Sequence, residues 1–405
     1  MPPGNRIPTT HVGSLPRTPD LIELNRARIS TPGAEIEPRF TESLRSAVER
    51  VVSRQVELGM DVPNDGEYGH EMDSALDYGA WWGYVFHRLG GLELGGPQLW
   101  EMPLRRSSPG NVVLTSFLDR RDWRLFEEAY TDPEAGVSLG GSQRRFPVCR
   151  GPITYTGQAA VARDIAAVRA AMSAAGASEA FLNAVAPGSC ARFANEYYAT
   201  DEEFMYACAT ALREEYTAII DAGLILQLDD PCIAENWDQI NPAPSVEDYQ
   251  RFTRQRVEAL NHAIAGLPSE RIRFHLCWGS WHGPHTTDIP MADILEVMLA
   301  VNADTYLFEA ANVRHEHEWK VWQDVTLPEG KVIAPGVVSH ATNLVEHPEL
   351  VADRIVRFAE VVGRENVMAG TDCGLGGRVH QQIAWAKLES LIEGAELASR
   401  RLWRG

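Results

Sequence analysis

Short apolar runs alternate with amphipathic helical stretches along most of this 405-residue chain, and this alternation limits the folds open to it. The apolar runs predict eight strands, which end near residues 12–14, 61–67, 151–154, 224–230, 272–277, 305–309, 332–338 and 367–373. Eight strands that alternate with helices predict an α/β protein with a (β/α)8 TIM barrel fold. Active sites of such barrels form at the carboxyl ends of the strands, where the notable polar residues of this chain also fall.

The expected helices have readable ends. Thr200-Asp201-Glu202-Glu203 is a capping box that opens one helix, and Ser245 precedes another. Four helical patterns stop at a glycine, the residue that most readily adopts a left-handed C-cap conformation; these glycines are Gly59, Gly223, Gly266 and Gly363. The boundaries place each of these helices between two predicted strands.

The stretch from Tyr68 to Arg150 does not fit a single strand–helix unit. It is rich in glycine, proline and aromatic residues, including Trp81, Trp82, Trp100 and Trp123. We expect a long insertion after the second strand, partly helical, that lies over or beside the barrel mouth. The chain, residues 1–405, is therefore expected to form one barrel domain with an insertion at about 68–150.

Charge and hydropathy exclude several classes of partner. The 37 basic and 56 acidic residues give a formal net charge of -19, which argues against binding to nucleic acid or to anionic membranes. An anionic substrate tail would need a local basic patch, such as Arg144, Arg145 and Arg150. No apolar run approaches the roughly 20 residues of a membrane span, and six scattered cysteines are expected to be reduced. We therefore expect a cytoplasmic protein.

Potential metal ligands follow several strands in the C-terminal half. His275 and Cys277 are two residues apart on one strand, so their side chains share a face. Glu309 and Cys373 follow two other strands. Two thiolates, an imidazole and a carboxylate are the ligands of a thiolate-rich zinc site, and their wide spacing in sequence is typical of a catalytic metal centre. His340 remains available for proton transfer.

Each of these residues also has a simpler interpretation. Glu309 could pair with Arg314 or Lys320, since a buried carboxylate needs a partner. His340 could be a loop histidine, and one of the adjacent acids Asp229 and Asp230 could only cap the next helix. Four other histidines are expected in solvated loops with surface roles: His282, His285, His315 and His317.

The predicted ligand set favours thiol chemistry. Zinc bound by two thiolates, an imidazole and a carboxylate is a weak Lewis acid that polarises water poorly, but it can bind a substrate thiol and remove its proton. A free thiol has a pKa near 8.5, so zinc binding raises its reactive fraction at neutral pH by roughly tenfold or more. Thiol alkylation is the predicted reaction class. A hydrolase would be expected to use histidine and aspartate ligands around a bound water.

At these residues the chain resembles the catalytic barrel of the cobalamin-independent methionine synthase family, which belongs to the methionine synthase/uroporphyrinogen decarboxylase-like barrels. The similar motifs occur in the same order and at similar spacing along the chain. They are Val12-Gly13-Ser14-Leu15-Pro16, Gly59-Met60-Asp61-Val62 with Gly66-Glu67, Leu226-Gln227-Leu228-Asp229-Asp230-Pro231, His275-Leu276-Cys277, Phe308-Glu309-Ala310-Ala311, Pro335-Gly336-Val337 with His340, and Asp372-Cys373-Gly374-Leu375.

The resemblance implies a specific site. Its metal ligands would be His275, Cys277, Glu309 and Cys373, and its cofactor Zn²⁺. Ser14, Glu67 and Asp229 would bind an amino-acid thiol, and His340 with Asp229 would act in catalysis. The methyl or alkyl donor would be a folate, a corrinoid or another small molecule. Folate-dependent members have a second, N-terminal barrel without a counterpart in these 405 residues, and the 68–150 insertion is not their pattern.

The leading hypothesis is a zinc-dependent transferase that moves a methyl or alkyl group to a thiol such as homocysteine. One alternative is a related zinc enzyme that opens an epoxide with a thiol, like the epoxyalkane:coenzyme M transferases, or cleaves a C–S bond. Another is a catalytically silent ligand-binding barrel. Glu67, Asp229 and His340 are not needed to hold zinc, so their presence argues against a silent barrel.

Overall fold

The computed structural model describes residues 5–30, 35–71, 81–95, 103–137 and 146–403. Its main sheet has six parallel strands in the order β3-β5-β6-β7-β8-β9. Their bounds are Phe181–Val185, Ile225–Asp229, Ile272–Leu276, Thr305–Phe308, Val332–Val338 and Gly370–Thr371. Parallel bridges join Thr9 to Ala369, Thr10 to Val62, and Asn64 to Phe181. These bridges add two segments between β9 and β3, so the sheet closes into the predicted (β/α)8 barrel.

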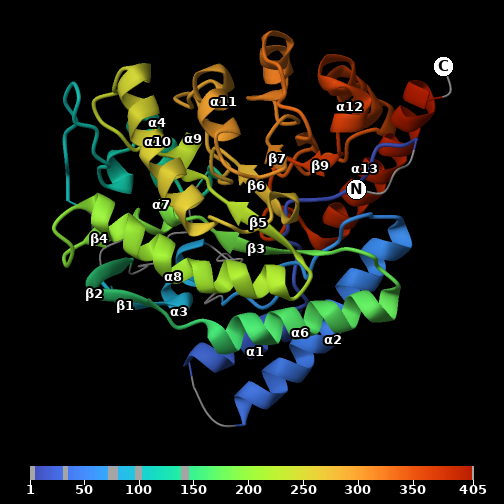
Figure 1. Ribbon diagram of the computed structural model, residues 1–405, viewed down its shortest axis with the longest axis horizontal. Helices are drawn as coiled ribbons and strands as arrows, with labels where there is room; N and C mark the ends of the chain where they lie inside the picture. Colours follow the sequence, from blue (N-terminus) through green and yellow to red (C-terminus); the bar gives the residue numbers. More distant parts are fainter. Residues whose placement is uncertain (1–4, 31–34, 72–80, 96–102, 138–145, 404–405) are drawn as a thin grey trace.

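Helices surround the strands (Figure 1). The long ones are α1 Pro19–Ser30, α2 Ile36–Leu58, α6 Gln158–Ala175, α8 Asp201–Asp221, α10 Val246–Ala263, α11 Met291–Leu299, α12 Pro348–Val362 and α13 Gln381–Trp403. Short helices follow β3 and β5, namely α7 Pro187–Cys190 and α9 Cys232–Glu235. After β7 the chain forms a 3₁₀ helix, η3 Glu316–Asp324, and two short 3₁₀ turns, η2 Ser269–Arg271 and η4 Arg364–Asn366, precede β6 and β9.

The structure confirms the expected helix ends to within a few residues. The Thr200 hydroxyl accepts a hydrogen bond from the Glu203 N–H at 3.1 Å, as a capping residue should. Ser245 caps α10 in the same way through the Asp248 N–H. Helix α2 ends at Gly59, which is left-handed with φ 100°, and α12 ends at Gly363. Helices α8 and α10 stop slightly before the predicted glycines, because their last turns continue irregularly to Gly223 and Gly266.

The prediction of a third barrel strand at 151–154 is wrong. Those residues belong to β2, Pro147–Tyr155, in a separate three-stranded sheet with β1, Leu89–Leu94, and β4, Ala194–Asn195. The third barrel strand is β3. Every residue of β3 is buried, as in a strand covered on both faces, whereas β2 exposes several residues to solvent. Both segments are apolar and β-rich, so the pattern alone did not separate them.

The described part of the predicted insertion, 68–150, contains several short elements. They are α3 Trp81–Arg88, β1, η1 Phe117–Asp119, α4 Arg121–Leu125, α5 Glu127–Thr131 and the start of β2. Arg88 joins α3 to the barrel through ion pairs with Asp164 of α6 at 2.7 Å and Glu215 of α8 at 3.2 Å. Trp100, Arg144 and Arg145 lie outside the described residues. Arg150 is exposed and pairs with Glu196 at 2.9 Å and Glu93 at 3.4 Å.

None of the helices in the described ranges is both long enough and apolar enough to cross a bilayer.

Candidate metal centre and active site

Three of the four predicted metal ligands lie together at the carboxyl ends of two strands. The ligand atoms of His275, Cys277 and Cys373 are all within 4.8 Å of one another. His275 is on β6, Cys277 comes directly after it, and Cys373 follows β9. All three side chains are nearly inaccessible to solvent. The ends of β6 and β9 therefore bring the His275–Cys277 pair together with a second cysteine that is distant in the sequence.

The two thiols differ in their affinity for protons. A hydrogen bond with Cys277, together with the nearby His275 and Arg378, lowers the pKa of Cys373 to about 7. The same hydrogen bond and burial raise the pKa of Cys277. Cys373 is therefore the easier thiolate to form, and a bound cation would favour loss of the second proton. The donor set fits a thiolate-binding ion such as zinc.

His275 is oriented by Asp229. Its Nδ1 lies 3.0 Å from Asp229 Oδ1, and its Nε2 lies 3.4 Å from the carbonyl oxygen of Asp372, the residue before Cys373. Asp229 also accepts hydrogen bonds from Gln227 Nε2 and Asn183 Nδ2, both at 2.8 Å. A carboxylate that fixes the tautomer and direction of a histidine is the common outer partner of a metal ligand. The Asp229 side chain remains 23% exposed, so it is also accessible to a small molecule.

Glu309, the fourth predicted ligand, lies in a second group. Its carboxylate, His340 and Asp372 offer ligand atoms within 4.8 Å of one another. Glu309 accepts hydrogen bonds from the Trp278 N–H at 2.9 Å and from Asn312 Nδ2 at 2.7 Å. Trp278 follows Cys277 directly, so the two groups adjoin. Burial raises the pKa of Glu309 well above its usual value, and the negative Asp372 and Cys373 add to this effect.

His340 lies two residues after β8 and is 2% exposed. Its Nδ1 has no hydrogen-bond partner among the described residues. Burial, reinforced by the positive Arg378, holds the pKa of His340 well below its usual value. The imidazole is therefore neutral at neutral pH.

The predicted substrate-binding residues lie on the first two barrel segments. The Ser14 carbonyl accepts hydrogen bonds from Leu375 N–H at 2.9 Å and Gly376 N–H at 3.1 Å, so Ser14 packs against the turn that follows Cys373. Glu67 has a left-handed backbone with φ 58°. Its side chain lies against Gly13, next to Asn183, which in turn donates to Asp229. Glu67 and Asp229 thus flank one asparagine.

Gly13 is required where the first segment passes these side chains. It has φ 139°, and an added Cβ would lie 2.5 Å from Asn183 Oδ1 and 2.7 Å from Glu67 Oε1. We expect Gly13→Ala to lower the free energy of unfolding by about 1–3 kcal/mol, because it combines backbone strain with displacement of buried polar groups. Urea denaturation measures this.

Gly176→Ala is the matched control for that substitution. Gly176 also has a positive φ, 70°, but no atom lies within 4 Å of the added Cβ. Gly176→Ala should lower the free energy of unfolding by about 1 kcal/mol. If Gly13→Ala loses no more stability than Gly176→Ala, the packing described around Asn183 and Glu67 is contradicted.

Sequence reasoning missed two residues that organise the site. Asn183 lies on β3, the strand that the sequence pattern did not reveal. A lone asparagine in the apolar run 181–185 is the feature that could have indicated it. Asp372 accepts hydrogen bonds from the N–H groups of Ala310 and Ala311, both at 2.7 Å, and so fixes the chain after Glu309. The sequence feature that could have indicated a role for Asp372 is its position at a strand end, next to the predicted ligand Cys373.

The expectation of surface roles is wrong for His315. This side chain is buried between Asp288, 3.1 Å from Nε2, and Glu318, 2.9 Å from Nδ1. These hydrogen bonds raise its pKa to about 10 despite burial. The Trp278 ring stacks on the imidazole at 3.9 Å. His317 is exposed, as expected.

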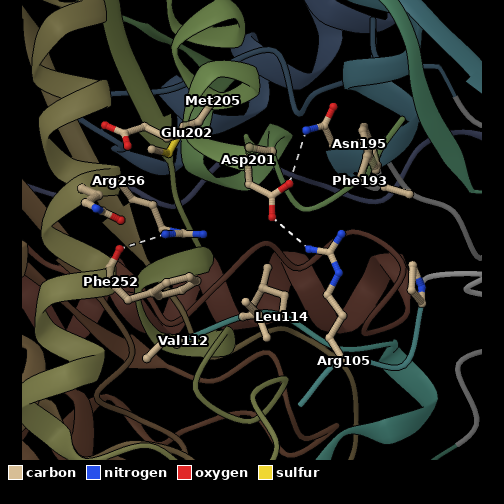
Figure 2. Close-up of a pocket in the computed structure, with 15 residues that line it drawn as sticks. Arg105, Val112, Leu114, Phe193, Asn195, Asp201, Glu202, Met205, Phe252 and Arg256 are labelled. Carbon is tan, nitrogen blue, oxygen red and sulfur yellow. Dashed lines mark hydrogen bonds and ion pairs between the residues drawn. The ribbon is translucent and has the colours of Figure 1, made fainter. Parts of the chain in front are cut away.

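A separate cavity lies away from these groups, where the insertion meets α8 and α10 (Figure 2). Asp201 points toward the guanidinium of Arg105 and pairs with it at 3.0 Å. Arg256 donates to the Phe252 carbonyl at 2.8 Å. The cavity contains none of the predicted site residues, so it is a junction between segments rather than part of the candidate site.

A family model of the cobalamin-independent synthase, catalytic domain, matches residues 143–397. The chain belongs to this family. The match covers β2 and almost all of the barrel from α6 to α13, including the groups around Cys277 and Glu309. The protein is thus an enzyme of the methionine synthase type, and the resemblance inferred from its motifs is confirmed.

Individual relatives agree with this assignment. The chain is 24% identical to a methionine synthase of Thermococcus kodakarensis over 403 residues, which are 98% of this chain and 95% of the relative. It is also 24% identical to a 5-methyltetrahydropteroyltriglutamate–homocysteine methyltransferase of Aliivibrio fischeri, of which it spans 43%.

A solved structure supports the fold. A B12-independent methionine synthase from a Shewanella species, in complex with selenomethionine, aligns with a TM-score of 0.70. It is 18% identical, and the alignment covers 99% of this chain and 100% of that one. This similarity supports the barrel architecture.

Proposed function

We propose that this enzyme transfers a methyl group to the sulfur of homocysteine, forming methionine, and that it depends on zinc. The observation that carries the proposal is the group of His275, Cys277 and Cys373 at the barrel mouth. This group supplies the thiol-rich donor set that zinc-dependent thiol alkylation needs. The names of the relatives support the same acceptor and product.

His275, Cys277 and Cys373 would hold the ion, with Glu309 as the fourth ligand from the adjoining group. Zinc bound there would lower the pKa of a substrate thiol and keep its sulfur nucleophilic at neutral pH. Asp229 would keep His275 in the tautomer that presents Nε2. The Asp372 contacts with Ala310 and Ala311 would keep Glu309 in place.

The other polar residues would bind the amino-acid part of homocysteine. Glu67 and Asp229 offer two carboxylates beside Asn183, which suits an ammonium group. Ser14, next to the turn after Cys373, would donate a hydrogen bond to the substrate carboxylate. This arrangement would hold the amino acid at one end while its thiol reaches the metal ligands.

We propose a methylated reduced folate as donor, in agreement with the name of the Aliivibrio relative. The sulfur forms a bond to the methyl carbon as the bond from that carbon to the donor nitrogen breaks. The thiol loses one proton and the donor nitrogen gains one, so the exchange is balanced. Neutral His340 would accept and return this proton. A corrinoid donor has no support from the comparisons.

The test is a methyl-transfer assay with the zinc-loaded protein, homocysteine and ¹³C-methyl tetrahydrofolate carrying one or three glutamates. We expect labelled methionine, detected by mass spectrometry, and less of it after chelation of the metal. Asp229→Asn should lower its yield, because the variant loses a carboxylate that orients His275. If only other thiols or an epoxide substrate react, the homocysteine assignment is wrong.

A further inference from the structure

We infer that Asp122, in the predicted insertion, is a positioning residue for the metal centre. It acts on the loop that follows β6, residues 277–290, which we call the β6 loop. The inference rests on the proposed function, because it assigns a further residue to the same site.

Asp122 fixes the distal half of the β6 loop. It lies in α4 and is 1% exposed. Its Oδ1 accepts hydrogen bonds from both the N–H and the hydroxyl of Thr286, each at 2.9 Å. Its Oδ2 accepts one from the His285 N–H at 3.3 Å. One carboxylate thus binds two backbone amides of the loop, a strong and directional form of hydrogen bond.

Tyr130 extends this contact to the middle of the loop. Its hydroxyl donates to Asp122 Oδ2 at 2.8 Å and accepts from Trp281 Nε1 at 2.7 Å. The Arg120 guanidinium covers the Trp281 ring at 4.0 Å. A Cβ at Gly283 would overlap both Trp281 and Tyr130, so the loop packs directly against these two side chains at Gly283. Asp122, Tyr130 and Arg120 all belong to the predicted insertion.

The other side of the β6 loop touches the candidate active site at four points. The loop begins with the ligand Cys277, and the next N–H, of Trp278, donates to Glu309. The Ser280 hydroxyl accepts a hydrogen bond from Arg378 at 2.8 Å, and Arg378 belongs to the turn that follows the ligand Cys373. His282 Nε2 lies 3.4 Å from the His340 carbonyl oxygen. A shift of this loop would therefore move a thiol, a carboxylate contact and the surroundings of His340 together.

Metal ligands need a supporting shell because small displacements change both affinity and reactivity. Loops have few backbone partners of their own, so external hydrogen bonds decide how well they are held. In the distal half of this loop the external hydrogen bonds come from Asp122, from Asp238 at Thr287, from Arg314 to the Thr286 carbonyl, and from His315 to Asp288. Asp122 is the one among them that binds two of the loop's backbone N–H groups. The insertion thereby becomes part of the metal site without supplying a ligand.

Asp122→Ala tests the inference against Asp119→Ala. Asp119 is equally buried and lies three residues earlier, but it binds Thr115, Arg106 and Arg124 and makes no hydrogen bond to the β6 loop. We expect Asp122→Ala to weaken zinc binding or lower kcat by about 10- to 100-fold. We also expect the visible thiolate-to-metal band of the cobalt-substituted protein to change. Asp119→Ala should leave the cobalt band unchanged, and its zinc affinity and kcat should stay within about twofold of the wild-type values. This holds whatever its effect on the melting temperature.

An unchanged cobalt spectrum with zinc affinity and kcat within twofold would overturn the inference. If Asp122→Ala does not fold, Tyr130→Phe removes only the hydroxyl that joins Asp122 to Trp281, and it should alter the spectrum in the same direction. An unchanged spectrum in a folded Tyr130→Phe protein would equally overturn it. The metal readouts need no substrate, so a wild-type protein that makes no methionine would refute the proposed function while still testing Asp122.

Discussion

The Cys277→Ser, Cys373→Ser double variant is expected to lose its zinc and all measurable methionine formation. The two thiols lie with His275 within 4.8 Å, and their removal leaves one imidazole and a carboxylate of the adjoining group. Thiolate ligation accounts for much of the roughly 10–16 kcal/mol that such sites gain from zinc at neutral pH. A fall in affinity by several orders of magnitude follows. Elemental analysis of the dialysed protein measures it.

Cys208→Ser is the matched control for the double variant. Cys208 is a fully buried cysteine of α8, packed in the hydrophobic core, and it belongs to neither group of potential ligands. Its replacement should lower stability but leave about one zinc per chain. Full zinc occupancy in the double variant would refute the metal centre, and loss of zinc from Cys208→Ser would show that occupancy reports folding instead.

His340→Ala should retain zinc and homocysteine binding while kcat falls by about 10²- to 10⁴-fold, the usual contribution of a positioned proton-transfer group. The reason is the position of the imidazole. It is buried and neutral, its Nδ1 has no hydrogen-bond partner in the described part of the chain, and it lies outside the group formed by the two thiols and His275. Zinc content, homocysteine binding by calorimetry and single-turnover rates measure the three effects separately.

The decisive comparison for His340 is with Glu309→Gln. Both residues belong to the second group, but only Glu309 is proposed as a ligand. Glu309→Gln should weaken zinc binding, whereas His340→Ala should not. If His340→Ala loses zinc in proportion to activity while Glu309→Gln retains it, the two roles are exchanged.

The barrel could be predicted from the sequence because its later strands end in both an apolar run and a functional side chain. β6, β7 and β8 were located within a few residues, as was the capped start of α8. The third strand could not be located in this way. Both β2 and β3 are short and β-rich, and only the pairing of β3 with β5 decides which one belongs to the barrel.

The candidate site shows the same division. Periodicity placed His275 and Cys277 on one face, and strand order placed Glu309 and Cys373 at the same end of the barrel. Neither pattern could specify which side chains contact one another, since these contacts depend on rotamers and on partners from other segments. Glu309 consequently lies with His340 and Asp372. His315 is buried between Glu318, three residues later, and Asp288, 27 residues earlier in the chain.

The closure of the barrel has a mechanical consequence. β6, which carries His275, is paired through four residues with each of its neighbours. The segments before Ser14 and Glu67 are joined to the sheet by isolated bridges and by turns. Backbone ladders resist deformation more than single bridges do, so we expect the wall that carries His275 and Asp229 to be stiffer than the segments that carry Ser14 and Glu67. Under the proposed function, Ser14 and Glu67 would adjust to the bound amino acid while His275 and Cys277 keep their geometry.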